Sequence, residues 1–322
     1  ESAGIAVRIG NAVNRVRRAG KVQELQPALD ATPLEAATGI SHTRRATHGD
    51  PNHVTAHPPV SSEDVIVVHT GIIENFEELR EKLQADGYDF ESETDTEAIA
   101  HRVHQHLRKS GNLADAVRET VHELEGAYAI AVMSVSDPDK LVIARAGAPA
   151  IVGIGEGENF VASDIAALLP VTRNYIILEE GDVAVVDREN VAVYDINDQP
   201  VERKVIESEL TADAAERGDF RHYMQKEIHE QAHAVAQTLE ERTANGKVLD
   251  AAFGPQAVDV LDRTRNVHIV ACGTSYHAGL IARYWIEDLC KLPCSVEIAS
   301  EYRYRSPVVP DDTLFVTISQ SG

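Results

Sequence analysis

The apolar residues in the first two thirds of the chain come mostly in short runs that are typical of β-strands. Turn residues separate these runs, which favours strands joined by loops. Between them lie segments with apolar residues at helical spacing, each followed by a glycine. Strands on either side of a group of helices predict an α+β sandwich. The expected strands are residues 4–7, 65–68, 128–133, 141–144, 175–178 and 183–186, and the expected helices are residues 76–85, 96–108 and 113–124.

The pattern changes in the last third of the chain. Residues 211–218 are small and charged, and residues 224–242 have the spacing of one amphipathic helix. Strands that alternate with helices then predict the start of a doubly wound α/β sheet. We expect strands at 267–271, 295–299 and 314–318, a loop at 272–276 and a helix at 277–289. The expected domains are residues 1–210 and 256–322, with a linker and its helix at 211–255.

The length of the chain bears on the number of domains, and its charge bears on the kind of partner. At 322 residues the chain is long for a single core. The net charge of −22 is spread along the chain. It argues against a nucleic acid partner, whose phosphates favour basic patches. A diffuse acidic surface fits a protein that works in high salt, so a halophilic source and an ordinary acidic cytosolic enzyme both stay open.

The apolar runs and the cysteines indicate where in the cell the protein works. No window approaches the roughly 18 apolar residues of a membrane span, so we expect a soluble protein with no membrane contact. The three cysteines do not resemble the disulfide framework of a small secreted domain, and we expect the cytoplasm. The sequence begins with Glu1 and stops at Gly322 inside a polar run, so we expect a fragment of a longer protein.

A polar cluster lies between two strand-like regions. It reads His42-Thr-Arg-Arg-Ala-Thr-His-Gly, and His57 follows further on. Arginine binds a carboxylate in bidentate fashion, and nearby hydroxyls and imidazoles complete such a pocket. A solvated basic loop is the alternative, and a histidine zinc site is a third.

Two more motifs precede expected helices. In Val68-His-Thr-Gly-Ile-Ile-Glu-Asn a strand runs into Gly71, where a freed backbone N–H can stabilise an oxyanion. The alternative is a glycine that only lets the chain turn. Ser92-Glu-Thr-Asp-Thr-Glu is typical of a helix N-terminus, with Asp or Thr as cap and Glu in the first turn. Its Asp95 can instead hold a substrate ammonium.

Two hydroxyl-rich segments follow expected parallel strands. They read Ala271-Cys-Gly-Thr-Ser and Ile318-Ser-Gln-Ser-Gly. Ligands bind at the carboxyl ends of such strands, and small polar residues supply donors for an anion there. The pair predicts a phosphate pocket. Because no lysine-bearing phosphate loop follows, a sugar phosphate is favoured over a nucleotide. None of the clusters implies a metal or an organic cofactor.

In their order, these motifs resemble the glutamine–fructose-6-phosphate aminotransferase family. The first three are similar to its class II glutamine amidotransferase (glutaminase) half. The hydroxyl-rich segments, with Arg221-His-Tyr-Met-Gln-Lys-Glu and Val296-Glu-Ile-Ala-Ser-Glu, are similar to its sugar-isomerase half. The resemblance implies an α+β N-terminal-nucleophile amidohydrolase sandwich (αββα) followed by the start of an α/β doubly wound sugar-isomerase (SIS) domain.

The resemblance also implies an activity. In the family, the amide nitrogen of glutamine passes as ammonia to fructose 6-phosphate, which gives glutamate and glucosamine 6-phosphate for amino-sugar and UDP-N-acetylglucosamine synthesis. The full-length protein is then expected to be a cytoplasmic homodimer. Carried over by motif, the expected glutamine contacts are Arg44, Thr47, His48 and Asp95, the oxyanion hole is Gly71 and Thr70, and the sugar-phosphate contacts are Thr274, Ser275, Ser319, Gln320 and Ser321.

Three positions depart from the family pattern. The nucleophilic cysteine, which attacks the amide with its own α-amine as base, has no counterpart in this chain. Thr70 stands where the family has asparagine, and Arg45 where it has tryptophan. Losing an oxyanion donor can cost on the order of 3 kcal/mol of transition-state stabilisation.

These departures bear on activity. We expect the fragment itself to be inactive, with the lysine, histidine and glutamate used for sugar opening beyond Gly322. One alternative is a regulatory sugar-phosphate-binding protein that has lost its glutaminase. Another is a different class II glutamine amidotransferase, such as a phosphoribosyl-amine synthase.

Overall fold

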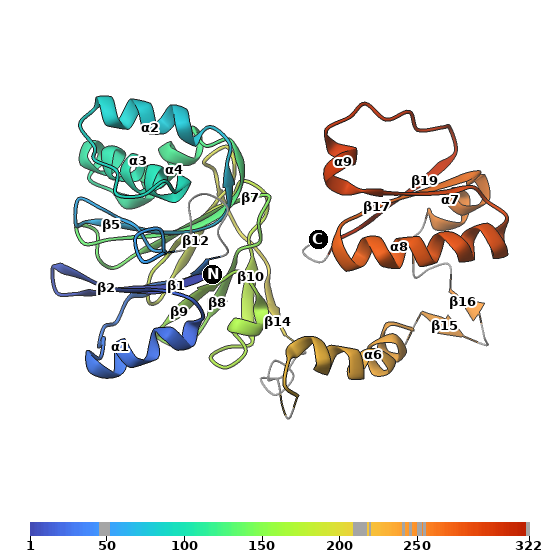
Figure 1. Ribbon diagram of the computed structural model, residues 1–322, viewed down its shortest axis with the longest axis horizontal. Helices are drawn as coiled ribbons and strands as arrows, with labels where there is room; N and C mark the ends of the chain where they lie inside the picture. The colour runs from blue at the N-terminus through green and yellow to red at the C-terminus, as the bar shows by residue number, and fades with distance from the viewer. Residues whose placement is uncertain are drawn as a thin grey trace. The chain divides into compact units, whose positions relative to one another are not determined.

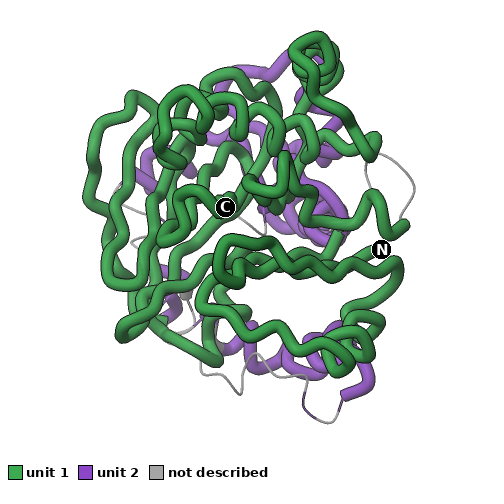
Figure 2. The backbone as a smooth tube through the Cα atoms, turned by 90° about the vertical axis from the view of Figure 1, so that its left-hand side faces the viewer, with its two compact units in different colours: residues 1–216 green, residues 217–322 purple. Residues whose placement is uncertain are grey.

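The chain forms two compact units, residues 1–216 and 217–322 (Figures 1 and 2). The computed structural model describes residues 1–44, 52–208, 218, 220–239, 242–244, 247–249, 253 and 256–319. The domain limits expected at residues 210 and 255 stay predictions.

An antiparallel sheet of seven strands forms the centre of the first unit, in the order β13-β12-β11-β7-β6-β5-β4. Every second residue of β5 faces the helices, so Val65 and Val67 are fully buried there. The strands are β4 (Val60–Ser61), β5 (Val65–Ile73), β6 (Gly126–Ser134), β7 (Leu141–Ala146), β11 (Val183–Val186), β12 (Val191–Tyr194) and β13 (Pro200–Val201).

Three helices cover one face of this sheet: α2 (Phe76–Ala85), α3 (Asp95–Ser110) and α4 (Leu113–Val121) (Figure 1). Gly111, in the left-handed conformation at φ 69°, ends α3. The helices expected at 76–85 and 96–108 are confirmed. The third helix ends three residues earlier than expected, because residues 122–123 form a turn before the chain enters β6.

Two smaller antiparallel sheets lie against the other face, with orders β2-β1-β3 and β14-β10-β8-β9. In Figure 1, α1 lies beyond β1 and β2 on the outer side. These layers confirm the predicted α+β sandwich. The elements are β1 (Ser2–Ile9), β2 (Ala12–Ala19), η1 (Val22–Glu24), α1 (Gln26–Ala31), β3 (Gly39–Arg44), β8 (Ile151–Ile154), β9 (Asn159–Ala162), η2 (Ile165–Ala167), β10 (Asn174–Ile177) and β14 (Val205–Glu207).

Strands β2 and β3 were not expected, since neither is an apolar run. The arginines of β2 form hydrogen bonds to backbone carbonyls instead: Arg15 donates to Pro58 and Arg17 donates to Val54 and Ala56. Strand β3 reads Gly-Ile-Ser-His-Thr-Arg, and its polar residues lead into the cavity described below.

The second unit contains a parallel sheet in the order β18-β17-β19, which confirms the predicted parallel strands. Its core contains the buried Val267, Ile269 and Cys294. The described elements of the unit are α6 (Tyr223–Leu239), β15 (Thr243–Ala244), β16 (Lys247–Val248), α7 (Ala257–Arg263), β17 (Asn266–Ala271), α8 (Gly273–Trp285), the π-helical turn η4 (Ile286–Cys290), β18 (Cys294–Ile298), α9 (Ala299–Arg303) and β19 (Thr313–Ile318).

The loop expected at residues 272–276 is wrong. Cys272 has extended backbone angles at the N-cap, and α8 begins at Gly273. Small polar residues are common both in loops and in the first turn of a helix, so their composition did not separate the two structures.

Candidate functional site

The end of β3, the middle of β5 and the start of α3 meet around a cavity of about 340 Å³ in the first unit. It brings together four of the residues expected at the glutamine site: Arg44, Thr70, Gly71 and Asp95. Thr47, His48 and Arg45 lie outside the described residues. The cavity is lined by His42, Thr43, Arg44, His57, His69, Thr70, Gly71, Ile72, Asp95 and Thr96.

Arg44 is the last residue of β3 and is only 5% exposed. The alternative of a solvated basic loop is therefore wrong for this residue. Burial lowers the pKa of the Arg44 guanidinium, and the charge of Asp95 opposes that shift. A buried cation beside a cavity is a suitable partner for a carboxylate.

Asp95 is the first residue of α3 and is 4% exposed. Its Oδ2 accepts the Ile73 backbone N–H at 3.1 Å, and its Oδ1 accepts the Thr96 N–H at 2.9 Å. The expected helix start is confirmed, with Thr94 at the N-cap and Glu97 in the first turn. The helix N-terminus favours an ionised carboxylate at this position.

Gly71 lies inside β5 rather than after it, opposite Tyr128 of β6. The expected end of the strand before Gly71 is therefore wrong. Its φ of +131° is open to glycine, and a Cβ here would come within 2.0 Å of the Ala127 carbonyl oxygen. Gly126, at φ +134°, lies opposite Ile73 and permits the same close approach of backbones.

A network of histidines and one threonine lies behind Asp95. The Thr96 hydroxyl is 2.7 Å from His57 Nε2 and 3.1 Å from His69 Nδ1, which is itself 3.7 Å from Asp95 Oδ1. No individual role was expected for His57 or Thr96, and His69 was not expected to belong to the site. A signal was present for His69, because the period of two in β5 places it on the same buried face as Val67.

His42 contacts the predicted oxyanion residue. Its Nε2 is 3.1 Å from Thr70 Oγ1, and its ring stacks on His57 with the centroids 4.8 Å apart. Burial, with the charges of His69 and Arg44, lowers the pKa of His42 to about 4. Burial also lowers the pKa of His57 well below its ordinary value. Both rings are therefore neutral at pH 7.

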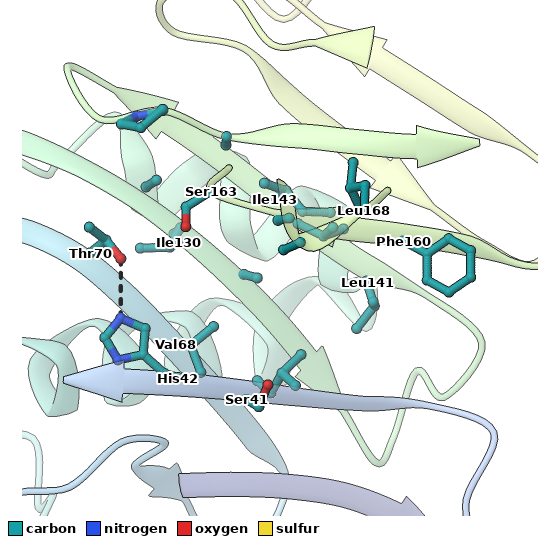
Figure 3. A pocket seen from close by; sticks show the side chains of 18 of the residues that line it. Ser41, His42, Val68, Thr70, Ile130, Leu141, Ile143, Phe160, Ser163 and Leu168 are labelled. Carbon is teal, nitrogen blue, oxygen red and sulfur yellow. Dashed lines mark hydrogen bonds between the residues drawn. The ribbon is translucent and has the colours of Figure 1, made fainter. Parts of the chain in front are cut away.

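A second cavity of about 380 Å³ begins at the same pair, as Figure 3 shows for Thr70 and His42. Its floor is apolar, with Ile130 and Ile143 from the seven-stranded sheet. Residues of β3 and β9 form its sides. Within the described residues, β3 pairs only with β1 and β9 only with β8.

The predicted phosphate contacts lie in the second unit. Thr274 and Ser275 are in the first turn of α8, and Ser319 directly follows β19. Because Ala271 is paired with Ile318, the segments after β17 and β19 leave the same edge of the sheet. Thr274 and Ser319 are exposed. Gln320 and Ser321 lie outside the described residues.

Among the described residues, no group of three or more His, Cys, Asp or Glu side chains is placed to hold a metal ion. None of the described helices combines the length and the apolarity that crossing a bilayer requires.

Two family models match the chain. Residues 42–170 match the glutamine amidotransferase domain, and residues 261–322 match the SIS domain. The first match contains the cavity residues from His42 to Thr96, and the second contains the parallel sheet.

Curated relatives match the whole chain. The glutamine–fructose-6-phosphate aminotransferase [isomerizing] of Shewanella oneidensis is 54% identical over 322 residues, and that of Pseudomonas putida is 53% identical over 323 residues. Each match covers 100% of this chain and 53% of the relative. The chain therefore spans about half the length of the relatives that it matches.

Solved structures support the fold. A glutamine phosphoribosylpyrophosphate amidotransferase from B. subtilis has a TM-score of 0.51 at 18% identity, covering 92% of this chain and 59% of its own. An allosteric regulatory enzyme of purine biosynthesis has a TM-score of 0.52 at 23% identity, covering 61% of this chain and 43% of its own. At these identities the likeness concerns the fold alone.

Proposed function

The chain belongs to the glutamine–fructose-6-phosphate aminotransferase family, and from this premise we propose that its parent protein transfers the amide nitrogen of glutamine to fructose 6-phosphate. The products are glutamate and glucosamine 6-phosphate, the starting point of amino-sugar synthesis. The observation that carries the proposal is 54% identity to such an enzyme along all of this chain, across both units. Because the chain spans about half of that relative, the complete reaction belongs to the longer protein.

Glutamine is proposed to bind in the 340 Å³ cavity of the first unit. Arg44 would bind its α-carboxylate and Asp95 its α-ammonium, since the two side chains carry the complementary charges and line one cavity. Thr47 and His48 would complete the site from outside the described residues. Both charged groups are at least 95% buried, because Arg44 is 5% exposed and Asp95 is 4% exposed. Low solvent exposure strengthens their interaction with a charged ligand.

The side-chain amide of glutamine would then lie near Thr70 and Gly71. In the family a cysteine thiolate attacks the amide carbon, the C–N bond breaks and ammonia leaves. The Gly71 N–H and the Thr70 hydroxyl are proposed to stabilise the oxyanion of the tetrahedral intermediate. We propose that the strand carrying that cysteine pairs with β3 and β9 above the apolar floor of the 380 Å³ cavity, which begins at Thr70.

The sugar phosphate is proposed to bind in the second unit. Thr274 and Ser275 offer hydroxyl groups in the first turn of α8, where the helix N-terminus favours an anion. Ser319, with Gln320 and Ser321, would donate from the neighbouring strand end. The parallel pairing of β17 with β19 supports this, because it places both segments at one edge.

Location and assembly are part of the same proposal. Homodimerisation of the parent, a cytoplasmic location and a role in the UDP-N-acetylglucosamine pathway follow from the family resemblance. A halophilic source is supported by the net charge of −22.

The test uses the full-length parent incubated with glutamine, fructose 6-phosphate, both or neither, followed by assays of glutamate and glucosamine 6-phosphate. We expect both products only when both substrates are present. Binding of the sugar phosphate without release of glutamate would favour the regulatory alternative, in which the substitutions at Thr70 and Arg45 have removed the glutaminase.

A further inference from the structure

The Thr70 hydroxyl has to act as a donor if it stabilises an oxyanion. A hydroxyl has one hydrogen and two acceptor lone pairs, so its direction depends on what its neighbours offer. Within the described part of the chain, the hydrogen-bond partner of Thr70 Oγ1 is His42 Nε2, at 3.1 Å (Figure 3). If this nitrogen accepted the hydrogen bond, the Thr70 hydroxyl would donate its one hydrogen to His42. If it donates, the hydrogen stays available for the cavity.

The surroundings of the other ring nitrogen decide between these two cases. Nδ1 of His42 is buried and has no hydrogen-bond partner among the residues that the structure describes. A neutral imidazole carries one N–H, and a buried N–H without an acceptor is rarer than a buried acceptor without a donor. The hydrogen therefore belongs on Nε2. The pKa of about 4 keeps the ring neutral at pH 7.

The ring of His42 is also held in place. It stacks on His57, and His57 Nε2 is fixed at 2.7 Å from the buried Thr96 hydroxyl. Thr96 is fully buried, and its own backbone N–H is bonded to Asp95. The direction of the His42 N–H thus depends on contacts that reach the first turn of α3.

We propose that His42 is a positioning residue for the glutaminase step: its Nε2–H is donated to Thr70 Oγ1, which turns the Thr70 hydroxyl into a donor toward the substrate oxyanion. This inference rests on the proposed function. It explains how a threonine replaces the asparagine of the family, since an amide supplies its N–H donors without help and a hydroxyl needs its hydrogen directed.

The test measures glutaminase kcat and KM of the full-length parent with His42→Leu and His42→Gln, each alone and combined with Thr70→Asn. His42→Leu removes the donor and should lower kcat about tenfold with KM for glutamine unchanged, because the hydrogen bond to the oxyanion exists only in the transition state. His42→Gln keeps an N–H donor and should restore most of kcat. Combined with Thr70→Asn, His42→Leu should cost less than about twofold, because the amide needs no orienting donor.

Two other results would overturn the inference. One is an equal loss of kcat from His42→Leu with and without Thr70→Asn; the other is an effect on KM alone. His53→Leu, at an exposed position of the same unit, is the matched control and should change neither constant.

A spectroscopic readout separates this inference from the proposed function. In the 322-residue chain labelled with ¹⁵N-histidine, His42 should show a protonated Nε2 and a bare Nδ1, with its signals identified by their loss in His42→Gln. A protonated Nδ1 would overturn the inference even if the parent is an active synthase. A parent that releases no glutamate would overturn the proposed function, and with it the positioning role of His42, whatever tautomer is observed.

Discussion

The two units present their predicted ligand contacts in different ways. In the first unit the charged contacts are buried: Arg44 is 5% exposed, and Asp95 is 4% exposed and accepts two backbone N–H groups. In the second unit, Thr274 and Ser319 are exposed hydroxyls beside a three-stranded sheet. In the first unit, burial and backbone hydrogen bonds hold the charged groups in place. In the second unit, the hydroxyl donors lie at the surface, in the first turn of a helix and just after a strand.

This contrast between buried and exposed contacts predicts where substitutions should be costly. A buried charged side chain, or a glycine where two backbones come close, cannot be replaced by water. A substitution there should therefore affect both ligand binding and folding. Exposed hydroxyls can be replaced by water, so a change there should weaken binding while leaving the fold intact.

The largest effect should come from the buried charges. In the full-length parent, Arg44→Ala or Asp95→Ala should lower kcat/KM for glutamine at least about 100-fold, since removing one partner of a buried charged contact costs about 3 kcal/mol. Fructose 6-phosphate binding, measured by calorimetry, should persist, which shows that the second unit is folded. Arg18→Ala on the exposed part of β2 is the control. Unchanged glutamine turnover would show that the site is elsewhere.

Replacing one glycine in each unit by alanine compares how strongly the stability of the two units depends on close backbone packing. Gly71→Ala should lower the free energy of unfolding by about 3 kcal/mol, because the new Cβ meets a backbone oxygen at 2.0 Å and φ is +131°. Gly273→Ala, at φ +57° with nothing within 4 Å, should cost only about 1 kcal/mol. Urea unfolding of the 322-residue chain measures both. Equal losses would contradict the contrast between the units.

The neutral histidines make the first unit sensitive to acid. The pKa of His42 falls from 6.5 to about 4 on folding, so the unfolded chain binds more protons between these values. Stability present above pH 6.5 should therefore be lost as the pH falls toward 4, by about 2 kcal/mol after allowance for solvent screening.

Urea unfolding at pH 7 and pH 5 measures this loss. NMR signals of Ile130 report on the first unit, and the fluorescence of Trp285, the only tryptophan in the sequence, reports on the second. His42→Gln should reduce the pH dependence, and His53→Gln should leave it as it is. A first unit equally stable at both pH values would argue against a buried neutral His42.

The smallest effect should come from the hydroxyls of the second unit, among which Ser275 is half-buried. Ser275→Ala in the full-length parent should raise the Kd for fructose 6-phosphate about fivefold, because one neutral hydrogen bond contributes about 1 kcal/mol. Thr317→Ala, at an exposed position of β19, is the control. The thermal midpoint should stay the same in both variants. A loss of folding with Ser275→Ala would mean that this hydroxyl has a structural role.

Much of the fold could be predicted from periodicity. Helices α2 and α3 follow from apolar spacing with a glycine after each end, and the parallel strands follow from short β-branched runs. Strand β3 could not be found this way, because its residues from His42 to Arg44 are polar and belong to the cavity. Strand β3 is held by backbone hydrogen bonds to β1, and backbone pairing leaves no signal in the pattern of apolar residues.

The candidate site was predictable residue by residue only where a motif carries it. Arg44, Gly71 and Asp95 stand in recognisable motifs, and the fold places them around one cavity. The contacts of His57 with Thr96 join positions 39 residues apart, so no local pattern could indicate them. The stacking of His42 on His57 depends likewise on the packing of β3 against the segment before β4.

The most direct test of the central claim follows the nitrogen atom. The full-length parent is incubated with fructose 6-phosphate and glutamine labelled with ¹⁵N in the side-chain amide, in a buffer that contains unlabelled ammonium. We expect glucosamine 6-phosphate that carries ¹⁵N, with an equal amount of glutamate. Unlabelled product, or bound sugar phosphate with neither product formed, would contradict it.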